Sequence, residues 1–269
     1  MREVTGKSDT STDERRREIV RRMYLTGYVG ARELSASMAV DASTIRRDLH
    51  ALAVAGLLER THGGARVPPG ASDLPYAIKE REHRSAKEAI GAAAAALVRD
   101  GDSVVLDSGS TVYEVAVHLR ERRELTVIAN DLRTAHLVAD FPSMRLLVPG
   151  GELLASNYAL VSDQAVSFVQ QLHVDWAFLG ADAIDEHGVT NTNTLEVPLK
   201  RAMLAAARRA VLVADSSKFG HATLVRVAGA EEFERVVTDE GFEPRDAVSY
   251  GVHIDTVRLV APEAPPLPA

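Results

Sequence analysis

The sequence predicts an α/β protein in two parts, a winged helix-turn-helix unit followed by a larger unit built on a mainly parallel sheet. Three observations predict this architecture. Residues 13–56 carry apolar residues at helical spacing in three short runs, and a Gly-Gly turn follows at 63–64. From residue 84 onward, short Val, Leu and Ile runs alternate with helical patterns, as in parallel sheets covered on both faces. Between the two parts, residues 68–75 contain three prolines and a glycine.

The N-terminal unit is predicted over residues 13–67, behind a polar, Ser- and Thr-rich segment at 1–12 that is expected to be disordered. Gly27 can end the first helix and Gly56 the third, because glycine readily adopts the left-handed conformation found just after helices. Ser and Thr at the start of the third helix are candidate N-cap residues. The predicted elements are helices at 13–23, 31–38 and 43–56 and a strand at 57–58.

The C-terminal unit is predicted over residues 81–261, after a linker at 68–80. Its helices are predicted at 84–99, 111–122, 132–139, 159–172 and 194–208. Its strands are predicted at 103–107, 125–129, 145–148, 174–179, 210–214, 235–238 and 256–260. The last eight residues hold four prolines and are expected to form a disordered tail.

Composition narrows the class of protein. The chain has 269 residues, 46% of them hydrophobic and 26% charged, which is typical of a globular protein of about two domains. It has no cysteine, which excludes a disulfide scaffold and a cysteine-ligated metal site. No metal, cofactor or catalytic residue is predicted. The longest apolar stretch, at 90–98, is too short to span a membrane, and the charged N-terminus is unlike a secretory signal. We therefore expect a cytoplasmic protein without a membrane partner.

The net charge of −7 is unevenly distributed along the chain. Residues 1–70 contain 12 Arg and Lys against 9 Asp and Glu, a net of +3, whereas the remaining residues carry a net of −10. Such asymmetry suggests two parts with different partners, although a difference of this size also arises by chance. Because an acidic surface repels DNA, a nucleic-acid partner is expected only for the N-terminal part.

The third predicted helix is suited to reading DNA. In a winged helix-turn-helix, the first residues of this helix meet base edges in the major groove, and Ser, Thr and Arg side chains bind bases or phosphates. The 63–64 turn is interpreted as a wing on the DNA backbone. The DNA-facing residues predicted in this way are Ser43, Thr44, Arg46 and Arg47 on the helix and His62, Gly63 and Arg66 in the wing. A small helical bundle with solvated arginines is the alternative.

The loop at 107–111, DSGST, is suited to holding a phosphate because it places backbone N–H groups and hydroxyls at a helix N-terminus. A plain strand-to-helix turn capped by Ser and Thr is the alternative. Polar residues follow other strands too, and ligands of open α/β sheets gather at the carboxyl ends of strands, so a phosphorylated polyol is expected there. These residues are Asn130, Asp131, Gly150, Gly151, Asp182, Asp185, Asp215 and Lys218.

Two motifs of the N-terminal part indicate a family. TIRRDL at 44–49, followed by G-L-x-x-R-x-H-G-G-A at 56–65, resembles the DNA-binding domain of the DeoR family of bacterial transcriptional regulators. The resemblance implies that residues 43–50, His50 among them, form the recognition helix. It also implies that residues 62–66 belong to the wing.

The C-terminal part resembles the effector domain of the same family, so the resemblance spans about residues 13–241. It rests on DSGST, GAD at 180–182, NTLE at 193–196 and ADSSKFG at 214–220. It implies a Rossmann-like α/β effector domain, similar to ribose-5-phosphate isomerase, that senses a phosphorylated sugar. The effector-binding residues that it implies are Asp107, Ser108, Gly109, Ser110, Thr111, Asn130, Gly151, Asp182, Glu196 and Lys218, with Lys87 as a further contributor.

The function expected from these observations is that of a DNA-binding repressor of a sugar-metabolism operon, controlled by a phosphorylated sugar. A homodimer or homotetramer is expected, because paired recognition helices meet paired half-sites on double-stranded DNA. One alternative is an enzyme like a sugar-phosphate isomerase with a DNA-binding head. The residues that could supply its base and its polarising group are Asp182, Asp185, Glu196 and Lys200. The other is a DNA binder whose C-terminal half only forms the oligomer.

Overall fold

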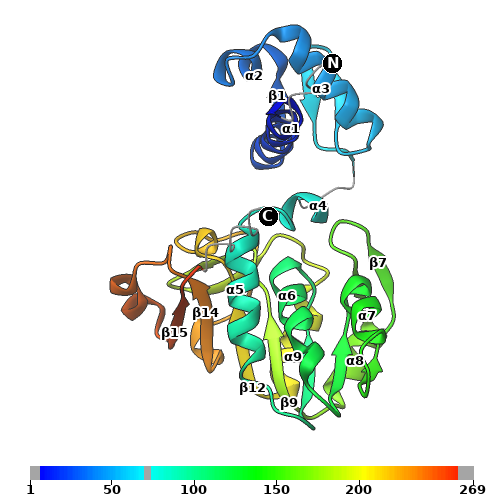
Figure 1. The fold of residues 1–269 in the computed structure, drawn as a ribbon, viewed down its shortest axis with the longest axis vertical. Helices are drawn as coiled ribbons and strands as arrows, with labels where there is room; N and C mark the ends of the chain where they lie inside the picture. The colour runs from blue at the N-terminus through cyan, green and yellow to red at the C-terminus, as the bar shows by residue number, and fades with distance from the viewer. Residues whose placement is uncertain (1–6, 70–73, 260–269) are drawn as a thin grey trace, which may run out of the picture. The chain divides into compact units, whose positions relative to one another are not determined.

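The computed structural model describes residues 7–69 and 74–259, which form two compact units (Figure 1). The N-terminal unit ends at Lys79 and the C-terminal unit begins at Glu80. One apolar core lies within the N-terminal unit and two lie within the C-terminal unit. The proline-rich tail at 262–269 falls outside the described residues.

The N-terminal unit packs its helices against a small antiparallel sheet in which β3 is the central strand. Ile19 and Met23 of the first helix meet Ile45 and Leu49 of the third, and all four side chains are buried. This arrangement confirms the predicted winged helix-turn-helix. The elements are α1 (Lys7–Thr26), β1 (Tyr28–Gly30), α2 (Ala31–Ser37), α3 (Ala42–Val54), β2 (Glu59–Thr61), β3 (Gly64–Arg66) and α4 (Tyr76–Lys79).

Two local predictions for this unit are wrong. Helix α1 begins at Lys7, so residues 7–12 are helical and not disordered. Their polar side chains carry no apolar period, and extending a helix that is already nucleated costs little free energy. The strand predicted at 57–58 begins two residues later, since Leu57 still donates its N–H to the Leu52 carbonyl at the end of α3 (3.0 Å).

The C-terminal unit is built on a seven-stranded sheet whose strand pairs are all parallel, as predicted (Figure 1). Its strands are β4 (Ser103–Leu106), β5 (Thr126–Ala129), β6 (Arg145–Leu147), β9 (Val174–Leu179), β12 (Ala207–Val213), β14 (Arg235–Asp239) and β15 (Ile254–Val257). The helices around it are α5 (Arg84–Ala95), α6 (Ser110–His118), α7 (Leu132–Ala139), α8 (Asp163–Gln170) and α9 (Val197–Ala206). Short 3-10 helices lie at Leu119–Glu121, Ser216–Lys218, Ala230–Glu232 and Pro244–Tyr250.

Both faces of this sheet are covered, and the alternation of its strands decides which core each side chain joins. Val104 and Leu106 of β4 point into the core beneath α5 and α6, whereas Val105 joins the core beneath α8 and α9. Successive side chains of a strand point to opposite faces, so strands buried on both faces appear as continuous apolar runs.

The strand order, β15-β14-β12-β9-β4-β5-β6, reverses between β4 and β9. The chain starts in the middle at β4, proceeds to β6 at one edge, then returns to β9 and proceeds to β15 at the other. Connections on the two sides of such a reversal leave the sheet in opposite directions, which opens a crevice at the carboxyl ends of the two strands. The fold therefore favours ligand binding where β4 and β9 end.

One predicted helix, at 159–172, is wrong in its first turn. Residues 159–161 form β8, and α8 begins only after Ser162, whose Oγ accepts the N–H of Ala165 at 2.9 Å. The short antiparallel strands of this unit were also not predicted, because three or four residues are too few to show alternation. They are β7 (Glu152–Leu154), β8 (Ala159–Val161), β10 (Ala183–Asp185), β11 (Gly188–Asn191) and β13 (Val225–Ala228).

Candidate functional site

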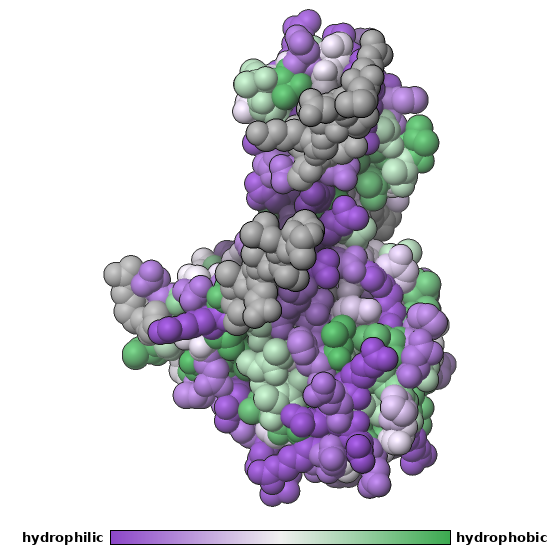
Figure 2. Space-filling model, viewed as in Figure 1, coloured by the Kyte–Doolittle hydropathy of each residue, from purple (hydrophilic) through white to green (hydrophobic). Residues whose placement is uncertain are grey.

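Helix α3 of the N-terminal unit presents one face to solvent. Ile45, Leu49 and Leu52 are buried in the core, so the opposite face of the helix turns outward. Hydrophilic side chains occupy much of the visible surface of this unit (Figure 2). Among the predicted DNA-facing residues of the helix, Ser43, Arg46, Arg47 and His50 are exposed, and Thr44 is half-buried. The helix thus offers two cations, an imidazole and a hydroxyl along one face.

Asp48 lies on the opposite side of the same helix and anchors it to α1. Its side chain is 2% exposed and accepts hydrogen bonds from Arg15 Nε (2.6 Å) and Arg16 Nε (2.8 Å). Two charge-assisted bonds to a buried carboxylate fix the rotation of α3 about its own axis. Sequence reasoning missed this role, because the two arginines precede Asp48 by more than 30 residues.

Strands β2 and β3 form the predicted wing. The turn between them places His62 and Gly63 in solvent, and Gly63 adopts a φ of +107° that favours glycine. Arg66 is exposed but already paired, since its guanidinium donates to both carboxylate oxygens of Glu59 at 2.8 and 3.1 Å. The wing therefore carries an arginine whose charge is already paired with a carboxylate.

In the C-terminal unit, the loop after β4 meets the loop after β9 where the strand order reverses. Asp107 directly follows β4 and is 1% exposed, and its Oδ2 accepts the backbone N–H of Gly180 at 3.1 Å. Lys200 of α9 donates its Nζ to the same Asp107 oxygen and to the Gly180 carbonyl at 3.0 Å. A buried ion pair thus joins β4, β9 and α9 where the strand order reverses.

The charge of Lys200 is held by its neighbours. Burial opposes the ammonium form, but the carboxylates of Asp107 and Glu196 outweigh it and raise the pKa of Lys200 above its ordinary value. Glu196 lies one helical turn before Lys200, is buried, and accepts a hydrogen bond from the Ser108 hydroxyl at 3.4 Å. Lys200 was not among the predicted effector-binding residues. Its spacing of four from Glu196 on a helix was the available signal.

The loop at 108–111 opens α6, and the N–H groups of that first turn have no partner inside the helix. Gly109 adopts a φ of +118° and donates its N–H to Asp131 Oδ2 at 3.4 Å. Asp131 also caps α7, where its Oδ1 accepts the N–H groups of Arg133 and Thr134 at 2.7 and 3.2 Å. Burial raises the pKa of Asp131 to about 6, although these hydrogen bonds oppose the rise.

Buried acceptor atoms line this edge of the sheet. Asp107 Oδ1 follows β4, Asn130 Oδ1 follows β5 and Asp215 Oδ2 follows β12, and none of the three atoms has a hydrogen-bond partner within the described residues. A buried acceptor without a donor is costly, so these atoms favour a ligand that brings hydroxyl groups. Among the described residues, no group of His, Asp and Glu is placed to hold a metal ion.

The remaining predicted residues fall at different depths. Asp182 follows β9 and accepts the N–H of Thr192 at 2.8 Å, and the buried Lys87 lies in the first turn of α5. Gly151 precedes β7 at a φ of +129°, where a Cβ atom would meet the Val161 carbonyl at 2.6 Å. Lys218 is half-buried after β12; its backbone N–H donates to the Asp215 carbonyl at 3.0 Å, and its side chain makes no hydrogen bond or ion pair within the described residues.

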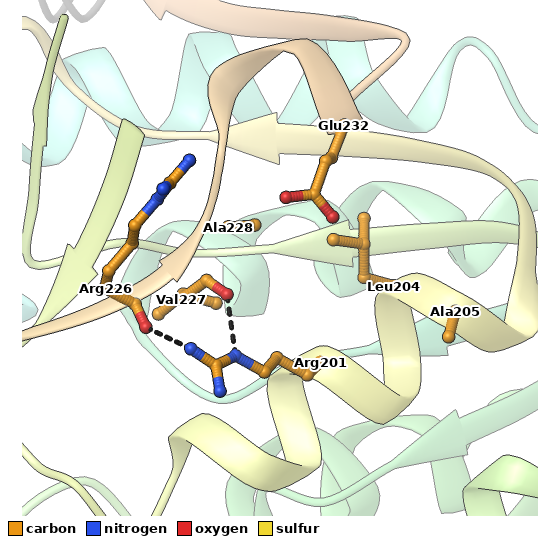
Figure 3. A pocket seen from close by; sticks show the side chains of 7 residues that line it. All are labelled: Arg201, Leu204, Ala205, Arg226, Val227, Ala228 and Glu232. Carbon is orange, nitrogen blue, oxygen red and sulfur yellow. Dashed lines mark hydrogen bonds between the residues drawn. The ribbon is translucent and has the colours of Figure 1, made fainter. Parts of the chain in front are cut away.

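A cavity of about 640 Å³ lies elsewhere in the C-terminal unit, between α9 and β13 (Figure 3). Arg201 donates to the carbonyls of Val227 and Arg226 at 2.9 and 2.7 Å along the edge of β13. The guanidinium thereby satisfies acceptors that an exposed strand edge would otherwise offer to another chain. No predicted effector-binding residue lines this cavity.

Within the described part of the chain, no helix is both long and apolar enough to cross a membrane. Residues 15–69 match the family model of the DeoR-like helix-turn-helix domain, and residues 82–240 match that of the DeoR C terminal sensor domain.

Curated relatives match over nearly the whole chain. The glycerol-3-phosphate regulon repressor of Haemophilus influenzae is 33% identical, over 88% of this chain and 92% of its own length. Transcriptional repressor AccR of Agrobacterium fabrum is 35% identical, over 86% of this chain and 91% of its own length.

Solved structures align with about half of the chain. Ribose 5-phosphate isomerase A from Methanocaldococcus jannaschii is 20% identical with a TM-score of 0.37, over 50% of this chain and 53% of that chain. Translation initiation factor eIF-2B from Pyrococcus horikoshii OT3 is 24% identical with a TM-score of 0.38, over 54% of this chain and 50% of that chain. The two family models and the two curated repressors show that this chain belongs to the DeoR family of transcriptional regulators.

Proposed function

We propose that the protein represses a sugar-metabolism operon and is controlled by a phosphorylated sugar or a related intermediate. The observation that carries the DNA-binding half of this proposal is the exposed face of α3, with Arg46 and Arg47 beside Ser43 and His50. A guanidinium can bind the O6 and N7 atoms of guanine through two hydrogen bonds, and a hydroxyl can bind a phosphate. As a DNA-binding regulator, the protein acts in the compartment of the chromosome, the cytoplasm.

The N-terminal unit alone carries too little positive charge to bind DNA tightly. The net charge of +3 over residues 1–70 allows few phosphate contacts, and the C-terminal part is acidic. When two N-terminal units of one oligomer bind two half-sites, the second binding event is intramolecular, which raises the overall affinity for DNA. A homodimer or homotetramer, with half-sites one helical turn or a multiple apart, therefore belongs to the proposal.

The effector half rests on the crevice between β4 and β9. The first turn of α6 offers N–H groups and the hydroxyls of Ser110 and Thr111 to a phosphate. The unpartnered acceptors of Asp107 and Asn130 then accept hydroxyl hydrogens of the sugar. A relative named for the glycerol-3-phosphate regulon makes three-carbon phosphates reasonable first candidates beside the pentose phosphates.

We assign regulation to this crevice and not catalysis. An isomerase needs a free carboxylate base close to the substrate carbonyl. Here the ammonium of Lys200 neutralises the buried Asp107 and lies close to Glu196, so this cluster is stabilised as an ion pair. Ketose formation from ribose 5-phosphate by the purified protein, lost in Glu196→Ala, would overturn this assignment.

The proposal is tested by fluorescence anisotropy with DNA duplexes taken from the region upstream of the gene. Arg46→Ala and Arg47→Ala are each expected to weaken binding by about 1–3 kcal/mol if the arginine reads a base. Arg123→Ala, which removes an exposed charge from the C-terminal unit, serves as the matched control and should bind normally. Equal binding by all three variants would move the recognition surface away from α3.

The effector is tested in the same assay with triose, pentose and hexose phosphates and with the matching unphosphorylated sugars. At least one phosphate is expected to shift the operator affinity, and Ser110→Ala should weaken that response. A panel without any effect would favour a C-terminal half that only forms the oligomer.

A further inference from the structure

Arg133 joins three elements of the effector edge to the first residue of the C-terminal unit. Its guanidinium lies over the rings of Tyr113 on α6 (5.4 Å) and Tyr158 in the hairpin of β7 and β8 (5.7 Å). It also holds both carboxylate oxygens of Glu80 at 2.8 and 3.4 Å. A planar guanidinium that lies over two rings and is bonded to a carboxylate has little freedom to move alone.

The same residue is tied to the loop that we propose for the phosphate. The backbone N–H of Arg133 donates to Asp131 Oδ1 at 2.7 Å, and Asp131 Oδ2 accepts the N–H of Gly109 at 3.4 Å. Tyr113 follows in the first turn of α6, where its N–H donates to the Gly109 carbonyl at 2.9 Å. Any shift of this loop therefore acts on Arg133 along two paths, through Asp131 and through Tyr113.

Glu80 stands where the chain leaves the N-terminal unit. Ile78 is 6% exposed and packs in the core of that unit, whereas Glu80 belongs to the C-terminal unit. Only Lys79 separates the two residues. The position of Glu80 consequently sets the point at which the N-terminal unit is attached, whatever arrangement the two units adopt.

We propose that the ion pair of Arg133 with Glu80 transmits occupancy of the 108–111 loop to the junction between the two units. This inference rests on the proposed function, since it takes that loop as the phosphate site. In the free protein the ion pair keeps the junction at residues 79–84 in place. A phosphate bound to the 108–111 loop breaks the ion pair and loosens these residues.

The release follows from competition at Gly109. A phosphate at the first turn of α6 takes the Gly109 N–H that now points to Asp131, and its negative charge repels the Asp131 carboxylate. Asp131 must turn away or take up a proton. Either change alters the hydrogen bonds by which Asp131 caps α7, the helix that carries Arg133. The ligand thus favours the released junction by its differential affinity for the two states, as any effector must.

Hydrogen exchange of the full-length protein tests this relay, with inorganic phosphate as the probe. Two regions are followed: amides 109–112 for binding and amides 79–84 for the junction. In the wild type, phosphate is expected to slow exchange at 109–112 and to speed exchange at 79–84 by at least about fivefold, the lower end of allosteric coupling. In Glu80→Gln, exchange at 79–84 should be fast without phosphate and should gain nothing from it.

Two further variants separate the ion pair from other effects. Glu82→Gln removes the same charge two residues away, from a side chain with no hydrogen bond or ion pair in the described structure, and should behave as the wild type. Arg133→Lys keeps the charge but loses the planar fork, so it should resemble Glu80→Gln. Glu80 is 38% exposed, which makes a folding defect in its variant unexpected.

The outcomes distinguish the relay from the proposed function. Slowed exchange at 109–112 without any change at 79–84 would overturn the relay and leave the phosphate site standing. A full response in Glu80→Gln would overturn it as well. Unchanged exchange at 109–112 in the wild type would overturn the phosphate site, and the relay with it.

Discussion

Lys200 donates a hydrogen bond to Asp107 across 93 residues of sequence, and the two side chains are only 4% and 1% exposed. This pair connects α9 to the end of β4 at the point where the strand order reverses. It forms a neutral, hydrogen-bonded unit there and leaves the buried Asp107 Oδ1 without a hydrogen-bond partner within the described residues. The pair is therefore both a structural link and part of the surface that we assign to the effector.

Replacing Lys200 by Met should destabilise the C-terminal unit. The Asp107 carboxylate would then be buried without a counter-charge, and breaking a buried pair in this way costs about 3–5 kcal/mol. The double variant Lys200→Met with Asp107→Asn should regain much of this loss, because no buried charge remains. Urea unfolding of each variant measures the difference. A single variant as stable as the wild type would mean that water reaches the pair.

Asp131→Asn should change how stability depends on pH. The pKa of Asp131 is about 6 in the folded protein against 3.8 in the unfolded chain, because burial disfavours its charge. The folded state binds the proton more tightly, so the wild type loses stability as the pH rises from about 4 to about 6 and then levels off. At 1.36 kcal/mol per pKa unit this amounts to about 3 kcal/mol at pH 7.

The asparagine variant keeps an oxygen for the cap of α7 and has no carboxyl group to ionise. Its free energy of unfolding, relative to the wild type, should therefore increase between pH 4 and pH 7. The exposed Asp140→Asn is the matched control. If the free energies of unfolding of wild type and Asp131→Asn changed in parallel over this range of pH, burial of the Asp131 carboxylate would not destabilise the folded protein.

The sequence was most informative where the hydrophobic residues follow a clear periodic spacing. The helix predicted at 132–139 and the strand predicted at 174–179 have those bounds in the structure. The helix predicted at 159–172 failed because Ala159–Val161 is an apolar run too short to distinguish a strand from a helix. The N-cap Ser162 was the local signal for the true start of α8.

The site was predictable as a set of strand ends but not as a network. Asp107 and Asn130 were predicted because the residues after parallel strands share one edge. The partners that matter most, Lys200 for Asp107 and Arg133 for Glu80, are joined only by the fold. Local patterns carry no information on such distant pairs.

Asp48→Asn should loosen the recognition helix. The variant removes the buried negative charge that pairs with Arg15 and Arg16. We therefore expect the free energy of unfolding of the N-terminal unit to fall by about 3 kcal/mol. Asp41→Asn is a close control, because Asp41 is exposed and its side chain makes no cap hydrogen bond to α3. Hydrogen exchange of α3 at increasing urea reports on this unit alone. Similar exchange in both variants would show that Asp48 does not anchor the helix.

Glu59→Gln should strengthen operator binding. In the free protein Arg66 is held by Glu59, so a DNA phosphate has to displace a carboxylate before it gains the guanidinium. Without that carboxylate, Arg66 adds about one phosphate contact, and the slope of log affinity against log salt should steepen by about 0.9. Anisotropy titrations at several salt concentrations measure both the affinity and the slope.

Glu14→Gln provides the comparison for this effect. It removes one exposed negative charge from α1 in the same unit and leaves the pair of Glu59 with Arg66 intact. A change of overall charge alone would affect the two variants alike, whereas release of Arg66 steepens the slope only for Glu59→Gln. Adding Arg66→Ala to Glu59→Gln should then abolish the gain. A gain that persisted in that double variant would exclude Arg66 as the wing contact.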